Sequence, residues 1–316
     1  MYYSTREGDV RAVDDVSFTL EKGTTLGIAG ESGSGKSSLA YTLMKLLPQN
    51  GSIRGGKITI AGVDVSDMPE GEVRSKVRWK HISLVPQSAM NALNPVFKVG
   101  EQISEAILVH QDTDPDIAIE KSKQMLELVG IDPRRYDSYP HELSGGMRQR
   151  AMIAMALVLN PDIIVADEPT TALDVIVQAQ IIQLLKDLKR TLSMSLILIT
   201  HDLSLVAEMS DMVIIFYAGQ IVEYGSSEAL FVTPAHPYTF GLIHAFPNLK
   251  GPKTKLISIP GSPPDLVAPP SGCRFNPRCQ FATQICREVE PELRSLNGGR
   301  LVRCHHAEEV LAKSVR

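Results

Sequence analysis

A glycine-rich loop near the N-terminus has the residue types and spacing that phosphate binding requires. Residues 30–37 have the sequence Gly-Glu-Ser-Gly-Ser-Gly-Lys-Ser, which matches the pattern G-x-x-x-x-G-K-[S/T] at every fixed position. Glycines permit the dihedral angles with which backbone N–H groups converge on phosphate oxygens, and a following helix adds its positive end. We predict that Lys36 reaches the β- and γ-phosphates of a nucleotide and that Ser37 binds Mg²⁺. The predicted nucleotide contacts are Gly30, Ser32, Gly33, Ser34, Gly35, Lys36, Ser37 and Ser38.

A pair of adjacent carboxylates follows a short apolar segment in the second half of the chain. Ile163–Ala166 is typical of a buried strand, and Asp167 and Glu168 come directly after it. Beside the phosphate loop, Asp167 can coordinate Mg²⁺ through water, and Glu168 can polarise an attacking water as general base. The alternative is a strand that ends in an acidic turn. The presence of Lys36 elsewhere in the chain favours the catalytic interpretation.

Four further motifs decide which kind of nucleotide-binding protein this is. They are Gln87 after Val85-Pro86, Leu143–Arg150 (LSGGMRQR), Thr171–Asp174 (TALD), and His201 between Thr200 and Asp202. In this order they resemble the Q-loop, signature motif, D-loop and switch histidine of the ATP-binding-cassette (ABC) family. The resemblance covers roughly residues 2–240. It implies a cassette that binds ATP with Mg²⁺ and hydrolyses it.

The resemblance also assigns roles to His201 and Gln87. Without it, His201 would be interpreted as a structural histidine and Gln87 as a surface residue. It implies that His201 contacts the γ-phosphate. It implies that Gln87 binds Mg²⁺ and opens Ser88–Gly100, the segment that in the family couples ATP binding to a membrane partner. Each of the two residues comes just after an apolar strand pattern, which favours these roles. The implied catalytic residues are Lys36, Gln87, Glu168 and His201.

The signature segment precedes a helical pattern at Gly145–Leu159, so it forms a second helix N-terminus that can bind phosphate. In the family this segment caps the γ-phosphate that a partner cassette holds, and two cassettes sandwich two ATP molecules head to tail. The alternative is an ordinary helix cap. The residues expected to contact nucleotide in this way are Ser144, Gly145, Gly146 and Asp174.

Tyr3 is the residue that the spacing favours for stacking on the adenine ring, with Tyr2 as the alternative. The alternative to an adenine contact is that Tyr3 is only a frayed residue at the chain terminus. The family normally has a strand of several residues before this aromatic, whereas this chain begins at Met1. We therefore expect that strand to be missing, which indicates a start codon further upstream and a weaker edge strand.

The elements between the motifs indicate an α/β fold with a mostly parallel sheet, because apolar strand patterns alternate with helical ones. A partly alternating strand is also expected over Ala12–Leu20, and the prolines of 247–272 indicate an extended linker. The resemblance implies a P-loop NTPase cassette with a RecA-like parallel core, an antiparallel β subdomain and an inserted helical subdomain. The expected boundaries are 1–87 and 161–228 for the core, 88–160 for the helical subdomain, and 229–316 for a small cysteine-containing extension.

The C-terminal segment 271–316 contains every cysteine of the chain and is basic, with 8 Lys+Arg against 5 Asp+Glu. Disulfides are disfavoured in a cytosolic chain, and the cysteine spacing lacks the close pairs that are typical of structural zinc. Four thiolates from one segment can instead bind an iron–sulfur cluster. The four cysteines are Cys273, Cys279, Cys286 and Cys304.

The same segment resembles the C-terminal extension of D-type ATPases from oligopeptide and dipeptide importers, as do His236–Thr239 (HPYT) and Ile259–Gly261 (IPG). In that family the extension is associated with a [4Fe-4S] cluster, which the resemblance therefore implies here. Zinc, disulfides and free thiols stay open as alternatives. Nearby arginines are expected to offset the thiolate charge, unless they form a solvated basic surface. They are Arg274, Arg278, Arg287 and Arg303.

Composition excludes several other classes of protein. The net charge of −4 argues against nucleic-acid binding over the whole surface. The longest apolar runs, such as Met212–Ala218, are too short to span a bilayer, and the N-terminus lacks the apolar region of a signal peptide. We therefore expect a peripheral protein at the cytoplasmic face of the membrane, whose pore is supplied by partners.

These inferences predict the ATPase subunit of an ABC importer for oligopeptides, dipeptides or oligosaccharides. The expected partners are a second, different ATPase subunit, two transmembrane permease subunits and an extracytoplasmic substrate-binding protein. One alternative is a soluble ABC ATPase of DNA repair or translation. Only 55 residues separate Gln87 from Leu143, which is short for a repair-type coiled coil. The second alternative is a redox-regulated, non-catalytic cassette, and the presence of Glu168 and His201 argues against it.

Overall fold

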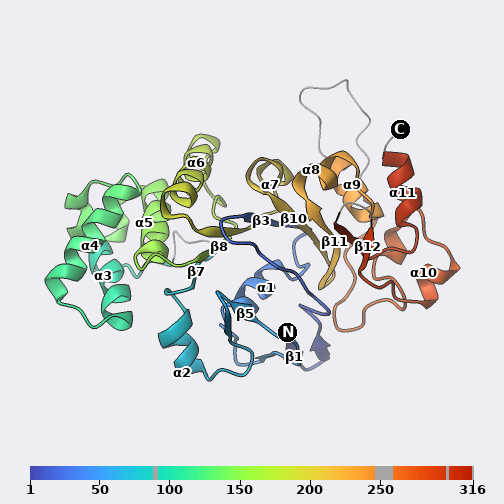
Figure 1. Ribbon diagram of the computed structural model, residues 1–316, viewed down its shortest axis with the longest axis horizontal. Coiled ribbons are helices and arrows are strands. Elements are labelled where there is room, and N and C mark those ends of the chain that lie inside the picture. The colour runs from blue at the N-terminus through green and yellow to red at the C-terminus, as the bar shows by residue number, and fades with distance from the viewer. Residues whose placement is uncertain (88–91, 246–258, 297–298, 315–316) are drawn as a thin grey trace.

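An eight-stranded mixed sheet forms the centre of the computed structural model, which describes residues 1–87, 92–245, 259–296 and 299–314 (Figure 1). Five neighbouring strands run parallel in the order β10-β3-β9-β8-β7. Their bounds are Thr25–Ala29 for β3, Ile82–Val85 for β7, Ile163–Asp167 for β8, Ser195–Ile199 for β9 and Met212–Tyr217 for β10. Nearly all their side chains are buried, as continuous apolar runs predict for parallel strands. The predicted α/β fold is confirmed.

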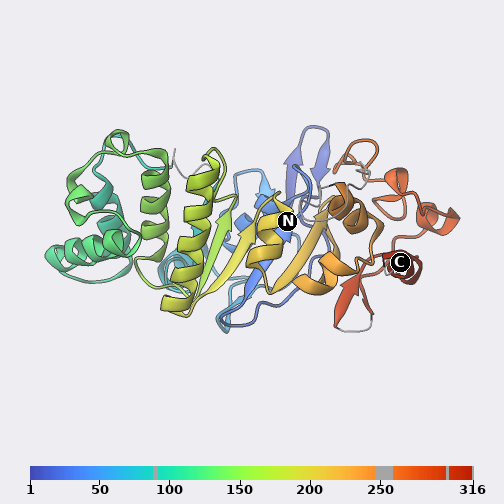
Figure 2. The same ribbon diagram turned by 90° about the horizontal axis from the view of Figure 1, so that it is seen from above.

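Helices cover both faces of this sheet (Figures 1 and 2). α1 (Lys36–Leu43) lies on one face, and α6 (Val175–Leu192) and α7 (Leu203–Met209) lie on the other. The stripe that α6 buries contains Ile181, Ile182, Leu185 and Leu188, with the three- and four-residue spacing of an amphipathic helix.

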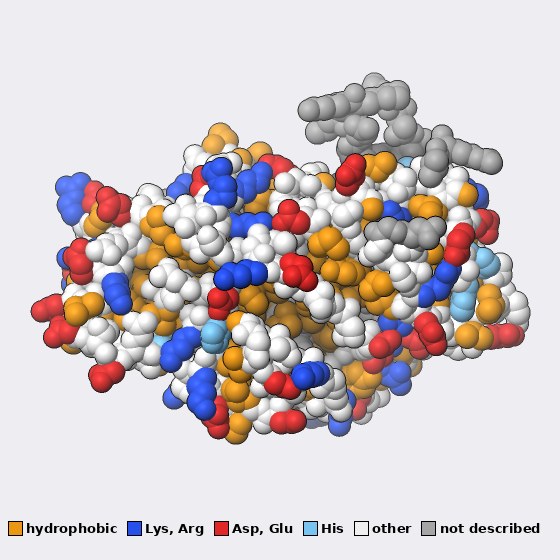
Figure 3. Space-filling model, in the orientation of Figure 1, with side chains coloured by type: hydrophobic (Ala, Val, Ile, Leu, Met, Phe, Trp, Pro, Cys, Tyr) orange, Lys and Arg blue, Asp and Glu red, His pale blue; other side chains and the backbone are white. Residues whose placement is uncertain are grey.

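Small antiparallel sheets form a β subdomain beside α1. β1 (Tyr2–Thr5) pairs with β2 (Gly8–Val10) and β4 (Gly51–Ser52). β5 (Thr59–Ile60) pairs with β6 (Val63–Asp64), and α2 (Glu70–Glu72) runs into a π-helical turn, η1 (Val73–Val77), that the sequence patterns did not predict. A cavity of about 860 Å³ separates this subdomain from the sheet, and Figure 3 shows hydrophobic side chains inside the hollow there.

A helical subdomain lies at one end of the molecule, beyond α6 (Figures 1 and 2). Its elements are α3 (Val99–His110), α4 (Pro115–Leu128), η3 (Pro133–Asp137), η4 (Pro140–Glu142) and α5 (Gly145–Leu157). The helices pack on one another through fully buried side chains, which are Ile103, Ile107, Leu126, Ile153 and Leu157. This packing holds the signature segment at the edge of the central sheet, because α5 also packs against β7 and α6.

The C-terminal part of the chain continues the central sheet. β11 (Gln220–Ser226) is antiparallel to β10, and β13 (Arg300–Val302) and β12 (Arg294–Leu296) extend the sheet beyond it. The remaining elements are α8 (Ser227–Val232), α9 (Pro237–Ala245), η5 (Asn276–Arg278), α10 (Gln284–Glu288) and α11 (Ala307–Ser314). The segment expected as an extension thus contributes two strands to the core sheet.

Several sequence expectations need correction or limitation. The strand over Ala12–Leu20 is wrong: Val13 N–H donates to the Met1 carbonyl and Asp14 N–H to that of Gly219, so no single ladder forms. The expectation of a weak edge strand or a frayed tyrosine at the N-terminus is also wrong. Tyr3 lies in β1, which pairs with β2 on one side and with β4 on the other. Of the expected linker 247–272, residues 247–258 lie outside the described part, and 259–272 contain no helix or strand. Among the described residues no helix has both the length and the apolarity needed to cross a bilayer.

Gly100→Ala should destabilise the helical subdomain. A Cβ at Gly100 would lie 2.1 Å from Tyr136 Cδ2, and this tyrosine is buried. We expect a loss of about 1–3 kcal/mol in the free energy of unfolding, measured by urea denaturation. The matched control is Gly71→Ala in α2, where no atom of the described residues lies within 4 Å of the added Cβ, and it should change stability by less than about 1 kcal/mol. Equal effects of the two substitutions would contradict the packing argument.

The buried His236 should make stability depend on pH. Its ring is buried and its Nδ1 accepts a hydrogen bond from Tyr238 N–H at 3.0 Å; burial lowers the pKa to about 3. Below about pH 6.5 the unfolded chain binds a proton that the folded chain does not, so stability falls with falling pH. His236→Asn should flatten the slope of unfolding free energy between about pH 6.5 and 5. The exposed His141→Gln should keep the slope; loss in both variants would refute the assignment.

Candidate nucleotide-binding and catalytic site

Glycine is required at two positions of the phosphate loop, which connects β3 to α1. Gly30 has φ 154° and Gly35 has φ 108°, a region that L side chains rarely adopt. A Cβ at Gly30 would lie 2.1 Å from the Phe216 carbonyl oxygen, and one at Gly35 would lie 2.0 Å from that of Ala12. The loop is therefore fitted closely between β10 and the N-terminal segment.

The side chain of Lys36 lies against this loop. Its Nζ donates hydrogen bonds to the carbonyl oxygens of Gly30 and Glu31 at 2.7 and 2.8 Å, and lies 3.5 Å from Ser34 Oγ. Burial lowers the pKa of Lys36, while the charges of Glu168, Asp167 and Glu31 raise it. The structure thus places the predicted phosphate-binding lysine among carboxylates that compensate its charge. Of the other predicted contacts, Ser32 and Gly33 are exposed.

Asp167 ends β8 as a buried carboxylate. Burial raises its pKa, and the Glu168 charge does the same, whereas the Ser37 hydroxyl and Lys36 lower the pKa. Neither carboxylate oxygen of Asp167 has a hydrogen-bond partner of good geometry within the described residues. An unpartnered carboxylate beside a hydroxyl supplies oxygen ligands of the kind that Mg²⁺ prefers. Asp167 and Ser37 therefore fit the predicted metal ion.

Among the residues that the structure describes, three side chains from separate parts of the chain contact Glu168. Its Oε2 accepts hydrogen bonds from Gln87 Nε2 and the Thr171 hydroxyl, both at 3.0 Å. Its Oε1 lies 3.2 Å from His201 Nδ1. The Glu168 side chain is 17% exposed, and that of His201 is 67% exposed, so the cluster opens to solvent on the histidine side. Thr171 was noted only as part of the D-loop, and no pattern indicated its contact with Glu168.

The sheet explains why these residues meet. β7, β8 and β9 are adjacent and parallel, so their carboxyl ends lie at one edge. Gln87 follows β7 by two residues, Glu168 follows β8 directly, and His201 follows β9 by two. Ligands bind at this edge in open α/β sheets.

Tyr3 lies next to the helix that follows the phosphate loop. Its hydroxyl donates to Ser38 Oγ at 3.0 Å, and its ring is half-buried. This contact places the ring of Tyr3 beside α1, and its stacking on adenine stays a prediction.

The signature segment and the D-loop form two neighbouring helix N-termini. Ser144 caps α5, with its Oγ accepting from Met147 N–H, and Asp174 caps α6, accepting from Val177 N–H. A Cβ at Gly146 would lie 2.7 Å from Val177 Cγ1, so the two helices approach closely there. Both views show α5 in the helical subdomain, apart from α1, so this chain does not bring its signature segment to its own phosphate loop (Figures 1 and 2).

The four cysteines are free thiols, and two of them are buried. Burial raises the pKa of Cys273 to about 11 and those of Cys279 and Cys304 to about 12, and neighbouring cysteines add to each shift. Over the described residues, no group of three or more His, Cys, Asp or Glu side chains is arranged to hold a metal ion. The cysteines are thus near one another without forming a preassembled metal site.

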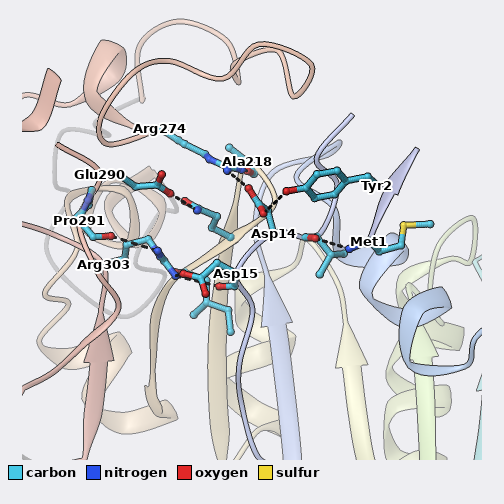
Figure 4. Close-up of polar contacts among 12 residues, drawn as sticks. Met1, Tyr2, Asp14, Asp15, Ala218, Arg274, Glu290, Pro291 and Arg303 are labelled. Atoms are coloured by element: carbon cyan, nitrogen blue, oxygen red, sulfur yellow. Dashed lines mark hydrogen bonds and ion pairs between the residues drawn. The ribbon is translucent and has the colours of Figure 1, made fainter. Parts of the chain in front are cut away.

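Three of the arginines near the cysteines are buried, so the alternative of a solvated basic surface is wrong for them. Arg274 pairs with Asp14 and donates to the Ala218 carbonyl, and Arg303 pairs with Asp15 (Figure 4). Arg278 pairs with Glu31 of the phosphate loop. Only Arg287 of the four is exposed. Sequence reasoning missed these pairs, because their partners lie more than 240 residues away.

Two family profiles match the chain. Residues 13–171 match the family described as "ABC transporter", and residues 222–286 match "Oligopeptide/dipeptide transporter, C-terminal region". The chain is 48% identical to the oligopeptide transport ATP-binding protein OppD of Haemophilus influenzae, covering 96% of this chain and 93% of that protein. It is 45% identical to the dipeptide transport ATP-binding protein DppD of Caldanaerobacter subterraneus, covering 97% and 94%.

Solved structures agree with these matches. The dimeric ATP-binding cassette MJ0796 bound to ADP and Pi has a TM-score of 0.63 and 27% identity, over 72% of this chain and 95% of that one. CbiO1 from Clostridium perfringens, part of the transporter complex cbiONQ, has a TM-score of 0.62 and 26% identity, over 73% and 87%. With the contacts around Glu168 and Lys36, the matches show that the chain belongs to the ABC transporter family, in its branch of oligopeptide and dipeptide transport ATP-binding proteins.

Proposed function

We propose that this chain hydrolyses ATP to drive the import of peptides through a membrane transporter. The observation that carries the proposal is the set of contacts that Gln87, Thr171 and His201 make with Glu168, beside the buried Lys36. Peptides are named as cargo because OppD and DppD, which this chain resembles over nearly its whole length, are oligopeptide and dipeptide transport ATP-binding proteins. Oligosaccharides are the alternative cargo.

Each residue of the site has its own role in ATP hydrolysis. Backbone N–H groups of the loop and Lys36 hold the β- and γ-phosphates, and the Tyr3 ring stacks on adenine. Water attacks the γ-phosphorus in line, the bond from that phosphorus to the bridging oxygen breaks, and Glu168 accepts the proton of the water. Hydrogen bonds from Gln87 and Thr171 hold the Glu168 carboxylate in place, and His201 contacts the γ-phosphate. Mg²⁺ held by Ser37, Gln87 and Asp167 would neutralise charge on the phosphate oxygens.

A partner cassette completes the site. Ser144, Gly145 and Gly146 stand at the N-terminus of α5, on a subdomain away from the chain's own loop, so they suit the nucleotide of a second cassette. Val175 and Ile176, which follow Asp174, are 79% and 73% exposed and would be covered in such a dimer. We propose a heterodimer with a second ABC ATPase subunit.

Membrane partners would dock beside the Q-loop. Val96 and Phe97 are 73% and 53% exposed, and they lie in the segment expected to couple ATP binding to the membrane. We propose two permease subunits and an extracytoplasmic substrate-binding protein as further partners, with this chain at the cytoplasmic face. A soluble ATPase acting on DNA or ribosomes is not favoured, because the C-terminal region matches the peptide-transporter family.

A [4Fe-4S] cluster at the four cysteines is our proposal for the C-terminal region, with zinc as the alternative. Its support is the presence of four thiols in one segment, where neighbouring cysteines add to the raised pKa of Cys273, Cys279 and Cys304. The thiols as described do not converge on one point. Binding therefore requires them to rotate toward one another and to lose protons that burial makes hard to remove.

Glu168→Gln should abolish turnover while leaving ATP bound. The amide cannot accept the proton of the attacking water, so we expect ATPase activity to fall by about 10²–10⁴-fold. Phosphate release measures turnover, and filter binding measures retained ATP. The matched control is Asp162→Asn, at the opposite end of β8, where the side chain contacts His81 instead. Turnover that stays at the wild-type level in Glu168→Gln would refute the assigned role.

Anaerobic purification should show which group the cysteines bind. An iron–sulfur cluster predicts a brown protein with broad visible absorption, about four iron per chain, and loss of both in Cys279→Ser. Zinc predicts a colourless protein with about one zinc per chain. A preparation with neither metal, whose four thiols all react with a thiol reagent after unfolding, would contradict both forms of the proposal.

A further inference from the structure

Glu31 is the residue at which the C-terminal region reaches the phosphate loop. It occupies the second position of the loop, next to Gly30. Arg278, which directly precedes Cys279, donates two hydrogen bonds to its carboxylate, from Nη1 to Oε2 at 2.7 Å and from Nη2 to Oε1 at 2.9 Å. The Arg278 side chain is 6% exposed and that of Glu31 is 25% exposed. Such a two-bond contact between a guanidinium and a carboxylate fixes orientation as well as charge.

The guanidinium of Arg278 is itself held in place. Its Nε donates to the Pro260 carbonyl oxygen at 2.7 Å, so three of its nitrogens are engaged. Its Cζ lies 5.8 Å from the centre of the Tyr217 ring and 6.0 Å from that of Phe275. Arg278 therefore meets Glu31 as a fixed partner rather than as a mobile surface side chain.

The backbone of Glu31 is engaged on both sides as well. Its N–H donates to the Tyr238 hydroxyl of α9 at 2.9 Å, and its carbonyl oxygen accepts from Lys36 Nζ at 2.8 Å. One residue thus joins the C-terminal region to the lysine that holds phosphate. A shift of Glu31 would move both a loop peptide group and a contact of Lys36.

A carboxylate within this loop poses an electrostatic problem. The loop must receive a polyanionic triphosphate, and an uncompensated negative charge beside it opposes binding. We propose that Arg278 is a positioning residue for nucleotide binding, which neutralises Glu31 and holds its side chain in the bidentate pair. This inference rests on the ATP-binding function proposed above. Arg278 acts through Glu31 and does not itself contact the nucleotide.

Replacing Arg278 should weaken nucleotide binding through Glu31. In the full-length protein, we expect Arg278→Ala to raise the dissociation constant for MgATP and the KM by about tenfold, with a smaller change in kcat. Arg278→Lys keeps the charge without the two-bond geometry, so its dissociation constant and KM should lie between those of the wild type and those of Arg278→Ala. The double variant Arg278→Ala/Glu31→Gln should recover most of the lost affinity, because it removes the unpaired carboxylate.

Arg303→Ala is the matched control. Arg303 is also a buried arginine that joins the C-terminal region to a carboxylate of the N-terminal segment, the exposed Asp15, but its hydrogen bonds go to Asp15, Ile221 and Pro291 and not to the phosphate loop. Its loss should lower the melting temperature and leave nucleotide affinity within about twofold. An unchanged affinity in folded Arg278→Ala, an equal loss in Arg303→Ala, or no recovery in the double variant would overturn the inference. A wild-type protein that fails to bind ATP would instead refute the proposed function.

Discussion

The buried ammonium group of Lys36 is the charge on which the arrangement of the nucleotide site depends. With 6% of the residue exposed, water cannot solvate it, and an uncompensated buried ion costs several kcal/mol. Loop carbonyls of Gly30 and Glu31 accept its hydrogen bonds, and nearby carboxylates favour its charged form. The parallel sheet makes this possible: β3 leads into the loop and β8 ends in Asp167, with β9 between them, so lysine and carboxylates meet at one edge.

The same compensation continues outward to the C-terminal region. Asp167 opposes Lys36, Lys36 opposes Glu31, and Glu31 is paired with Arg278. Each charge can remain poorly solvated because the next has the opposite sign. The strands β12 and β13 add backbone pairing to this connection by extending the central sheet. The C-terminal region is therefore part of the electrostatic structure of the nucleotide site as well as a neighbour of it.

Local patterns predicted the parts of the molecule that local physics determines. The parallel strands appear as apolar runs, and Gln87, Glu168 and His201 follow such runs, so their meeting at one edge could be expected. The alternation of apolar and polar residues over Ala12–Leu20 reflects alternating burial and not strand pairing. Backbone groups of this segment bond to separate partners, such as Met1 and Gly219. The pair of Glu31 and Arg278 spans 247 residues, and Glu31 fills a position that the loop pattern leaves free. No sequence pattern could connect them.

Unlike the charges of the nucleotide site, thiolates at the cysteines would have no free positive partner among the buried arginines nearby, because these arginines are already paired with carboxylates. Arg274, Arg278 and Arg303 are paired with Asp14, Glu31 and Asp15, so they cannot also neutralise four thiolates. Burial raises the pKa of Cys279 and Cys304 to about 12, which keeps these thiols protonated near neutral pH. A thiolate cluster there needs positive charge from the bound metal itself. Arg278 precedes Cys279 in the sequence, yet its guanidinium hydrogen-bonds Glu31 of the phosphate loop and the Pro260 carbonyl, so its charge is already compensated by the loop.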